Sequence, residues 1–325
     1  MKSFVNILII GSGNIGSRHL QGALKSKFKL MITIVDTNID SIELSKFRSN
    51  DIKLGNSKTY IEYTQKIPTN KNYEIAIIST NAVVRAEVTK ILLSHNKVKY
   101  IIFEKVLFQK EENFKSISKL LKKKNVTAWV NCPRRTWNVF QKIKKTLNNN
   151  KVIEMTVCGS SWGMACNSIH FIDLFSYLVD NYDIRVTKKM FSNNILKSKR
   201  GGKFYEVNGE IAIKAQSHSL KIICEESKKN LFLNVKIKNE KFEYLIDEYK
   251  SICNSFTDGL MKQRAIKIPM QSDETGKVID GLISRKYCKL TPYHESCKHH
   301  MPLINSIREH LSKILKSDLD KCPIT

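Results

Sequence analysis

A glycine-rich turn placed between an apolar strand and a helix constrains the fold of this chain more than any other feature. Residues Gly11–Gly16 read GxGxxG directly after the apolar run Val5–Ile10. The first glycine allows a tight turn, the second lets a pyrophosphate approach the backbone, and the third permits close packing of helix on strand. The N–H groups and positive dipole at the beginning of the helix favour phosphate. Backbone contacts to a dinucleotide are expected at Gly11, Gly13, Asn14, Ile15 and Gly16.

An acidic residue at the end of the second apolar run indicates which dinucleotide to expect. Asp36 follows Leu30–Val35 and stands 20 residues after Gly16. A carboxylate at that place accepts hydrogen bonds from the ribose hydroxyls of NAD and disfavours the 2′-phosphate of NADP. Thr37 and Asn38 follow, so no arginine adjoins the acid. The sequence predicts NAD as the cofactor, with Asp36 and Thr37 at the adenosine ribose, whereas an ordinary surface turn is the alternative.

The first 130 residues alternate between apolar runs of strand length and helical patterns. Strands are expected at Val5–Ile10, Leu30–Val35, Ile75–Ser79, Tyr100–Phe103 and Val126–Val130. Helices are expected at Ile15–Lys25, Ile39–Phe47, Val83–His95 and Glu111–Lys123. The runs are continuous and rich in Ile and Val, which is typical of strands buried on both faces. This part of the chain therefore predicts an α/β fold with a doubly wound parallel sheet, the Rossmann arrangement.

Beyond Pro133 the pattern changes to strands with few helices between them. Strands are expected at Val152–Val157, Ile211–Ala215, Leu220–Cys224, Leu231–Ile237 and Phe242–Ile246. Helices are expected at Thr136–Leu147, Ser168–Leu178, Asp273–Arg285 and Glu295–Lys316, with a turn at Asn148–Asn150. The short connections Glu225–Lys229 and Lys238–Glu240 suit antiparallel neighbours.

Two domains are the natural division of a chain of 325 residues. We expect residues 1–125 to form the NAD-binding domain. Residues 126–325 would form an α+β domain on a largely antiparallel open sheet, which holds the substrate and mediates oligomerisation. The C-terminal helix could pack either there or back on the first domain.

Composition narrows the class of protein further. The net charge is +25, but only ten of the 55 basic residues are arginine. The basic residues are also spread along the whole chain. Because base readout favours arginine, we expect no specific nucleic-acid partner, and the positive field would instead attract anionic small molecules. No apolar run is long enough for a membrane span, and the first apolar run is too short for a signal peptide. The eight cysteines, without a CxxC pair, suggest reduced thiols of a cytoplasmic protein.

A cluster near the C-terminus offers soft ligands. Its members are Cys288, His294, Cys297, His299 and His300. Their spacing matches no paired zinc-knuckle pattern, so the beginning of a helix is the favoured interpretation and no metal is expected.

The run that ends in Glu104-Lys105 resembles the Glu-Lys-Pro motif of the Gfo/Idh/MocA oxidoreductases, relatives of glucose–fructose oxidoreductase and inositol dehydrogenase. Other family features follow in order along nearly the whole chain: His19, Thr80-Asn81, Asn131, Arg134-Arg135, His170 with Asp173, and the ending Leu290–Ser296. The resemblance implies further cofactor contacts at Thr80, Asn81 and Glu104, and it implies a homo-oligomer.

The resemblance also implies a catalytic site. In the family the lysine of the motif lies near the nicotinamide and the substrate hydroxyl, and a histidine helps to carry the proton, so Lys105 and His170 take these roles here. Hydride transfer from an alcohol carbon requires removal of the hydroxyl proton, and burial beside the oxidised cofactor would lower the pKa of the lysine. Asn167 would position a substrate hydroxyl. The alternatives are a lysine that snorkels at a strand end and a core histidine.

The chain departs from the family pattern in three places. Val106 replaces the proline after Lys105, which makes a cis peptide bond improbable. Cys166 replaces the acid commonly found four residues before His170, and a thiol cannot replace a carboxylate as a strong acceptor. Arg85 replaces a histidine common in the helix after Ile75–Ser79.

The remaining substrate contacts are expected at Arg134, Arg135, Trp162, Cys166 and Asp173. Arginine suits phosphate or carboxylate and an aromatic ring suits a sugar face, although packing between domains is the alternative. The chain is thus expected to be an NAD-dependent dehydrogenase or reductase that acts on a secondary alcohol or ketone of a sugar or nucleotide-sugar, in the setting of surface-glycan biosynthesis. A non-catalytic NAD-binding regulator or scaffold is the alternative, and Cys166 favours it.

Overall fold

The computed structural model describes residues 4–325 except 51, 57, 148–150, 195, 199–200, 202 and 228–230. The described chain forms two compact units. The first unit extends to Phe108 and also includes Glu112–Asn131 and Pro269–Tyr293. The second unit contains Gln109–Glu111, Cys132–Ile268 and His294–Thr325. The break thus follows Asn131, six residues beyond the expected boundary, and the helix near residue 280 lies in the first unit instead of the second.

The first unit is built on a seven-stranded sheet in the order β17-β6-β5-β4-β1-β2-β3. Its strands are β1 (Val5–Ile10), β2 (Leu30–Val35), β3 (Tyr60–Thr64), β4 (Asn72–Ile78), β5 (Lys97–Phe103), β6 (Thr127–Val130) and β17 (Thr291–Pro292). All pairs are parallel except β17 with β6. The chain order reverses between β1 and β4, so the predicted doubly wound parallel sheet is confirmed.

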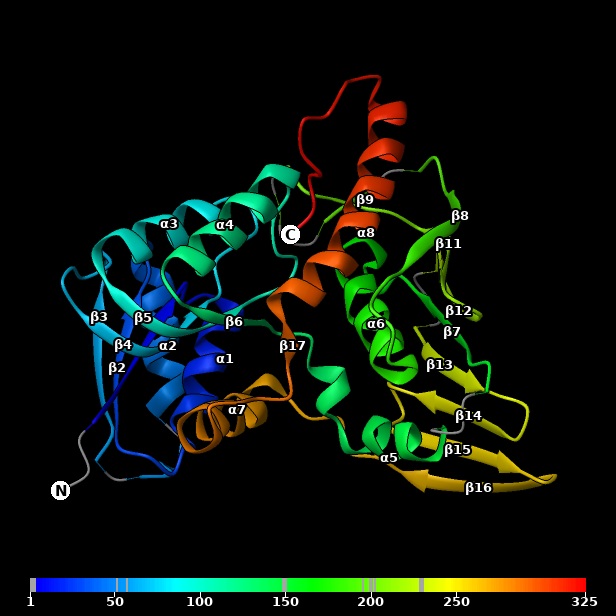
Figure 1. Cartoon of the computed structure of the whole chain (residues 1–325), viewed down its shortest axis with the longest axis horizontal. Coiled ribbons are helices and arrows are strands. Elements are labelled where there is room, and N and C mark those ends of the chain that lie inside the picture. The colour runs from blue at the N-terminus through cyan, green and yellow to red at the C-terminus, as the bar shows by residue number, and fades with distance from the viewer. Residues whose placement is uncertain are drawn as a thin grey trace. The chain divides into compact units, whose positions relative to one another are not determined.

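Helices cover both faces of this sheet, as continuous apolar strands require. They are α1 (Asn14–Ala23), α2 (Ile39–Asn50), α3 (Arg85–His95), α4 (Glu111–Lys123) and α7 (Gln271–Arg285). Figure 1 shows α3 and α4 on one side of the sheet and α7 on the other. Helix α7 crosses α1 closely, because a Cβ on Gly276 would stand only 2.6 Å from the carbonyl oxygen of Gly22.

The second unit is built on an eight-stranded sheet in the order β16-β15-β14-β13-β7-β12-β11-β8. These strands are β7 (Glu154–Ser160), β8 (Arg185–Phe191), β11 (Gly209–Ala215), β12 (His218–Glu225), β13 (Leu233–Lys238), β14 (Phe242–Asp247), β15 (Ile252–Thr257) and β16 (Leu260–Ala265). A two-stranded sheet pairs β9 (Leu196–Lys197) with β10 (Tyr205–Glu206). Every pair in the large sheet is antiparallel except β7 with β12, which confirms the predicted antiparallel-rich domain.

One predicted strand pairing is wrong. The connection between β12 and β13 was expected to join antiparallel neighbours, but β7 lies between these two strands. Val157 of β7 is fully buried and has Ile222 on one side and Val235 on the other. Placing this apolar strand in the sheet centre satisfies both of its hydrogen-bonding edges. The connection Lys238–Glu240 does join the antiparallel pair β13 and β14.

Burial alternates along the strands of the second unit, so one face of the sheet is covered and the other is open. The helical segments of this unit are η1 (Pro133–Thr136), α5 (Asn138–Leu147), α6 (Met164–Val179) and α8 (Tyr293–Leu315), of which the part from His294 on belongs here. Helix α6 packs on β12 and also on η1.

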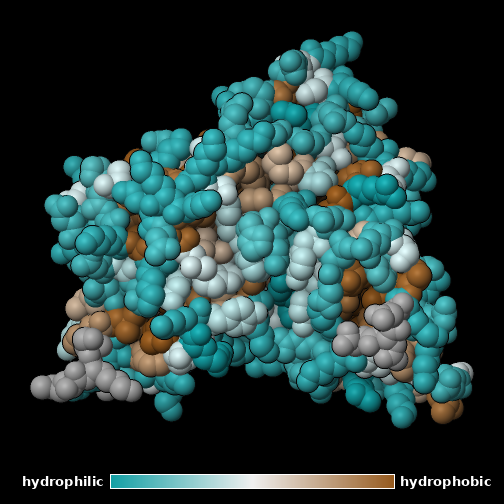
Figure 2. Space-filling view, viewed as in Figure 1, coloured by the Kyte–Doolittle hydropathy of each residue, from teal (hydrophilic) through white to brown (hydrophobic). Residues whose placement is uncertain are grey.

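The surface agrees with the composition. Hydrophilic side chains cover most of the face seen in Figure 2, as expected for lysines spread along the chain. All eight cysteines are free thiols. Of the helices in the described part of the chain, none combines the length and the apolar character needed to span a bilayer.

Candidate cofactor and substrate sites

The glycine-rich turn has the geometry that the sequence predicts. Gly11 has φ +91°, and a Cβ there would lie 2.8 Å from the backbone nitrogen of Thr80. A Cβ on Gly16 would stand 1.7 Å from the carbonyl oxygen of Gly11, so no side chain fits at either position. At Gly13 the nearest atom to such a Cβ is 3.9 Å away. The backbone at Gly13 is therefore open to a ligand, and that open space is where a pyrophosphate fits.

A cavity of about 740 Å³ lies at this turn. Its lining includes Gly11 and Gly13 after β1, Asp36 and Thr37 after β2, and Thr80 and Asn81 after β4. These segments follow the carboxyl ends of β1, β2 and β4, where the strand order reverses and where α/β sheets bind nucleotides. Six of the predicted cofactor residues are thus brought together by the fold.

Asp36 is held by backbone donors. Its Oδ2 accepts a hydrogen bond of 2.7 Å from the N–H of Ser12, and its Oδ1 accepts one of 2.9 Å from the N–H of Asn38. The first of these bonds fixes the carboxylate against the glycine-rich turn. The acid therefore stands where a ribose bound beside the turn would meet it.

Arg48 on α2 contacts the helix that follows the glycine-rich turn, and the sequence did not predict this contact. Its guanidinium donates to the carbonyl oxygen of Asn14 at 3.1 Å, to the Asn14 side chain at 3.2 Å and to Ser17 Oγ at 2.7 Å. Burial, followed by the positive charge of Arg18, lowers the pKa of Arg48. The contacts steady the first turn of α1. They could not be foreseen because 34 residues separate Arg48 from Asn14.

Glu104, at the end of β5, is the centre of a buried network. Its Oε1 accepts hydrogen bonds from His19 Nε2 at 2.8 Å and from Asn131 Nδ2 at 2.5 Å. Burial by itself would raise the pKa of Glu104, but these two bonds and the charges of His19 and Arg85 outweigh it and lower the pKa. The network joins three motif residues of the resemblance and fixes the strand end that carries Lys105.

Lys105 is 8% exposed and is the second residue after β5. The expectation of a trans peptide bond after it is wrong, because the bond between Lys105 and Val106 is cis. The guanidinium of Arg85, itself 2% exposed, donates to the carbonyl oxygens of Thr80, Val106 and Leu107. Arg85 therefore ties the segment after β4 to the segment after β5 and fixes the path of the loop beyond Lys105.

In the second unit, α6 carries the other expected catalytic residues. Cys166 is 8% exposed and its thiol lies 3.5 Å from the carbonyl oxygen of Gly163. Asn167 donates from its side chain to the carbonyl oxygen of Trp162 at 2.8 Å. His170 is one turn further on the same helix and is partly exposed.

The two predicted arginines are engaged within the second unit. Arg135 donates to both oxygens of the fully buried Asp173, at 2.9 and 3.0 Å. Burial would lower the pKa of Arg135, but the adjacent Asp173 carboxylate raises it. Arg134 donates to both oxygens of Glu248, at 2.8 and 2.7 Å. These pairs fasten η1 to α6 and to the segment after β14.

A second cavity, of about 670 Å³, opens at the beginning of α6. Trp162, Cys166 and Asn167 line it, together with Glu206 and Asn208, which the sequence reasoning did not select. Glu206 Oε2 accepts a hydrogen bond of 2.8 Å from the N–H of Ala165 in the first turn of α6, a favourable place for an acid.

Several polar atoms lie close together at the N-terminal end of α6. Gly163 has φ +75°, and a Cβ there would stand 3.2 Å from Asn167 Nδ2, 3.3 Å from Glu206 Oε1 and 3.4 Å from Cys166 Sγ. Asn208 is 4% exposed, and its Nδ2 has no hydrogen-bond partner among the described residues. A carboxylate acceptor and an unmet amide donor in one cavity suit a ligand rich in hydroxyl groups.

Within the part of the chain that the structure describes, no group of three or more His, Cys, Asp or Glu side chains could hold a metal ion. The five residues near the C-terminus that offered soft ligands therefore do not form such a group. Cys288 is buried, which raises the pKa of its thiol to about 12.

The parallel sheet, its glycine-rich turn and the acid after β2 define an NAD-binding Rossmann domain. Residues 5–132 match the family described as the Gfo/Idh/MocA oxidoreductases, NAD-binding Rossmann fold. The cofactor-binding unit is therefore similar to that family over these residues, as its motifs predict. No curated protein sequence matches the chain.

Solved structures extend the likeness to both units. An oxidoreductase from Agrobacterium radiobacter, in complex with NAD+, L-tartaric acid and magnesium, is 10% identical with a TM-score of 0.70 and covers 93% of this chain and 94% of its own. The UDP-N-acetylglucosamine 3-dehydrogenase GnnA from Acidithiobacillus ferrooxidans is 9% identical, with a TM-score of 0.68 and 94% of each chain covered. A super-repressor mutant of Gal80p from Saccharomyces cerevisiae is 13% identical, with a TM-score of 0.71 and 95% and 96% covered. At such identities the likeness shows the fold alone.

Proposed function

We propose that this protein is an NAD-dependent dehydrogenase or reductase that acts on a secondary alcohol or ketone of a sugar or nucleotide-sugar. The observation that carries the proposal is the position of Lys105. It is a buried lysine at the carboxyl end of β5. The neighbouring strand is β4, and Thr80 and Asn81, which follow β4, line the cofactor cavity. Active groups of α/β proteins gather at this edge of the sheet.

The chemistry assigned to Lys105 is proton transfer. NAD supplies the hydride acceptor when it is bound. Oxidation of an alcohol carbon also requires that the hydroxyl proton leave, and Lys105 Nζ would take it or, in the reverse direction, return it. The buried hydrogen bonds of Glu104 hold the beginning of the loop that contains Lys105, and the hydrogen bonds of Arg85 hold its end. Together they orient Lys105. His170 on α6 is the second candidate for the relay.

The cavity of the second unit is proposed to hold the sugar hydroxyls. Cys166 cannot accept a hydrogen bond as a carboxylate does, but Glu206 brings a carboxylate to the same place from β10. Glu206 is proposed to replace the acid that α6 lacks. Asn208 and Asn167 add amide groups, and Trp162 adds an aromatic edge. The names of structurally similar proteins include a dehydrogenase of a nucleotide-sugar, which is compatible with this substrate class.

A non-catalytic regulator that binds NAD is the second candidate. The observation that favours it is Cys166 in the place of the family acid, and one protein of the same fold is named as a repressor mutant. Cofactor binding is common to both candidates, and turnover separates them.

The test begins with mass spectrometry of ligands that copurify with the protein. Spectrophotometric assays of sugars and nucleotide-sugars with NAD and NADH follow. The proposal expects turnover of at least one of them, and Glu206→Gln should raise KM with Asn167 and His170 intact. NADH binding without turnover of any compound in the panel would favour the regulator.

A homo-oligomer is proposed on the open face of the second sheet. Ile223 and Leu245 lie on that face, since their strand neighbours Ile222 and Ile246 are buried on the other. Phe256 shares the face, because it lies two residues after Asn254, which stands opposite Leu245. Light scattering over a range of concentrations should give a mass above that of one chain. A monomer at every concentration would refute this part of the proposal.

A further inference from the structure

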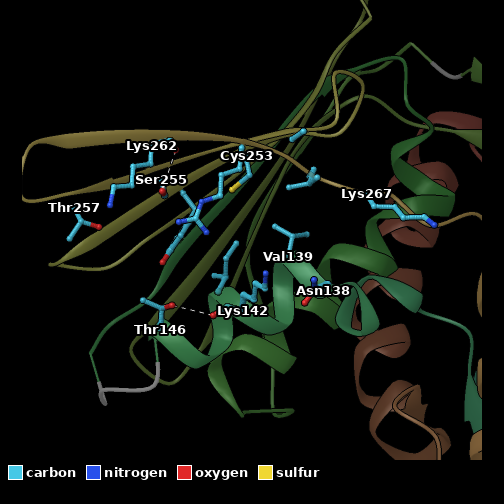
Figure 3. Close-up of a pocket in the computed structure, with 14 residues that line it drawn as sticks. Asn138, Val139, Lys142, Thr146, Cys253, Ser255, Thr257, Lys262 and Lys267 are labelled. Atoms are coloured by element: carbon cyan, nitrogen blue, oxygen red, sulfur yellow. Dashed lines mark hydrogen bonds between the residues drawn. The ribbon is translucent and has the colours of Figure 1, made fainter.

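A third cavity lies within the second unit, between α5 and the three strands at one end of the large sheet, β14, β15 and the edge strand β16. It has a volume of about 390 Å³. Figure 3 shows Lys142 and Thr146 on the helix and Ser255, Thr257 and Lys262 on the strands, on opposite sides of the hollow. None of the residues assigned above to cofactor or substrate lines it.

The charges in this hollow are all of one sign. Lys142 comes from α5, Lys262 and Arg264 come from β16, and Lys267 follows that strand. Among the described residues that line the cavity, none is acidic. Within the described chain none of the four cations forms an ion pair either. Four cations around one hollow repel one another and favour an anionic occupant.

The excess of lysine in the chain does not by itself explain this cluster. On the opposite face of the same sheet several lysines have acidic partners. Lys221 lies 3.0 Å from Glu210, and Lys236 lies 2.9 Å from Glu243. Lys238 makes a similar pair with a glutamate of β7 at 3.0 Å. The sheet therefore pairs several of its lysines with acids on one face, whereas the cations of the cavity on the other face have no such pairs among the described residues.

Strand register and the helix end bring further groups suited to phosphate. Ser255 stands opposite Lys262, and Cys253 stands opposite Arg264, so a hydroxyl adjoins the ammonium group and a thiol adjoins the guanidinium in the lining. Asn138, the first residue of the ten-residue helix α5, lines the cavity at the helix N-terminus, where backbone N–H groups favour anions. Tyr244 and Ile143 provide an apolar part of the lining.

We propose that this cavity is a binding site for a small molecule that carries at least two phosphate groups. Its volume lies within the range of small-ligand sites. Arginine binds phosphate oxygens through two parallel bonds, and the lysines add point charges along the hollow. A nucleic-acid strand would require stacked aromatic side chains along a longer groove, and Tyr244 is the one aromatic residue among the described lining residues.

The experiment is calorimetry on the full chain saturated with NADH. The phosphates of NADH then already occupy the phosphate-binding groups of the cofactor site, so the probes cannot bind there. Inorganic pyrophosphate and tripolyphosphate are the probes. The pocket variant is Lys142→Gln with Arg264→Gln. The matched control is Lys145→Gln with Lys214→Gln, which removes the same charge from two exposed positions of the second unit outside the cavity. All four side chains are exposed, so the fold should persist, and circular dichroism checks it.

We expect wild type to bind tripolyphosphate more tightly than pyrophosphate. The pocket variant should lose about tenfold or more in affinity, because two charge-assisted contacts are removed, while the control should change by less than about twofold. Equal losses in both variants would mean unspecific attraction and would overturn the proposal. So would the absence of binding, or tighter binding of a single-stranded oligonucleotide that depends on the same residues. None of these outcomes depends on turnover. Failure of this proposal can therefore be distinguished from failure of the proposed enzymatic function.

Discussion

Replacement of the buried Arg85 by methionine should destabilise the first unit. The guanidinium donates to the carbonyl oxygens of Thr80, Val106 and Leu107, and only 2% of the residue is exposed. Methionine has a similar length but no donor, so Arg85→Met leaves these buried oxygens without that partner. The two segments that Arg85 joins, after β4 and after β5, would then lose this link between them.

The magnitude follows from two opposing effects. A hydrogen bond to a charged group contributes about 1.5–3 kcal/mol, so three such bonds set an upper limit of roughly 5–9 kcal/mol. Removing the guanidinium also removes the unfavourable burial of its charge, which is several kcal/mol. The net loss expected is about 3 kcal/mol. Loss of a single partner from a buried charged pair gives losses of the same order.

Urea unfolding followed by hydrogen exchange in peptides from β4 and β5 measures this loss. The local probe is needed because two units need not unfold in one step. Arg185→Met, at an exposed arginine of the second unit, is the control and should change stability by less than about 0.5 kcal/mol. A loss below about 1 kcal/mol in Arg85→Met would show that the guanidinium does not hold the two segments together.

Two further predictions concern the cofactor unit. Wild type should bind NADH more tightly than NADPH in calorimetry, and Asp36→Ala should narrow this difference in affinity. The reason is that the carboxylate beside the turn accepts hydrogen bonds from the ribose hydroxyls and repels a 2′-phosphate. Equal affinities for the two cofactors in wild type would contradict the assignment. Since folding lowers the pKa of Glu104, its carboxylate stabilises the fold above its unfolded pKa of about 4.3, and this stabilisation is lost as the pH falls through the lower folded value. The stability advantage of wild type over Glu104→Gln in thermal unfolding should therefore shrink from pH 7 towards pH 3, and a constant difference would refute the linkage.

Local patterns predicted much of the first unit. The apolar runs gave β1 and β2 with their observed bounds, and the glycine-rich turn has the steric environment that the motif requires. Strand β3 was missed because Tyr60–Thr64 is partly exposed at the sheet edge and lacks a continuous apolar run. Strands β15 and β16 were missed for a similar reason, since β16 is exposed along its whole length.

Long-range contacts account for what the sequence could not predict. The pairing of Arg85 with the loop after β5 depends on two parallel strands that place distant segments side by side. Glu206 reaches the beginning of α6 from a two-residue strand that no periodicity marks. The partners of Arg135 and Arg134 likewise come from 38 and 114 residues away. Sequence motifs therefore predicted six residues that line the cavity at the glycine-rich turn. In the lining of the second cavity they predicted Trp162, Cys166 and Asn167 but not Glu206 or Asn208.

The most direct test of the proposed function is the effect of Lys105→Ala on turnover and on NADH affinity, with whichever sugar or nucleotide-sugar the substrate screen identifies. Positioned proton-transfer groups contribute about 10²- to 10⁴-fold, so turnover should fall by roughly that factor while the dissociation constant of NADH stays nearly unchanged. An enzyme that keeps its turnover after loss of both Lys105 and His170 would contradict the assignment of the proton transfer to these residues.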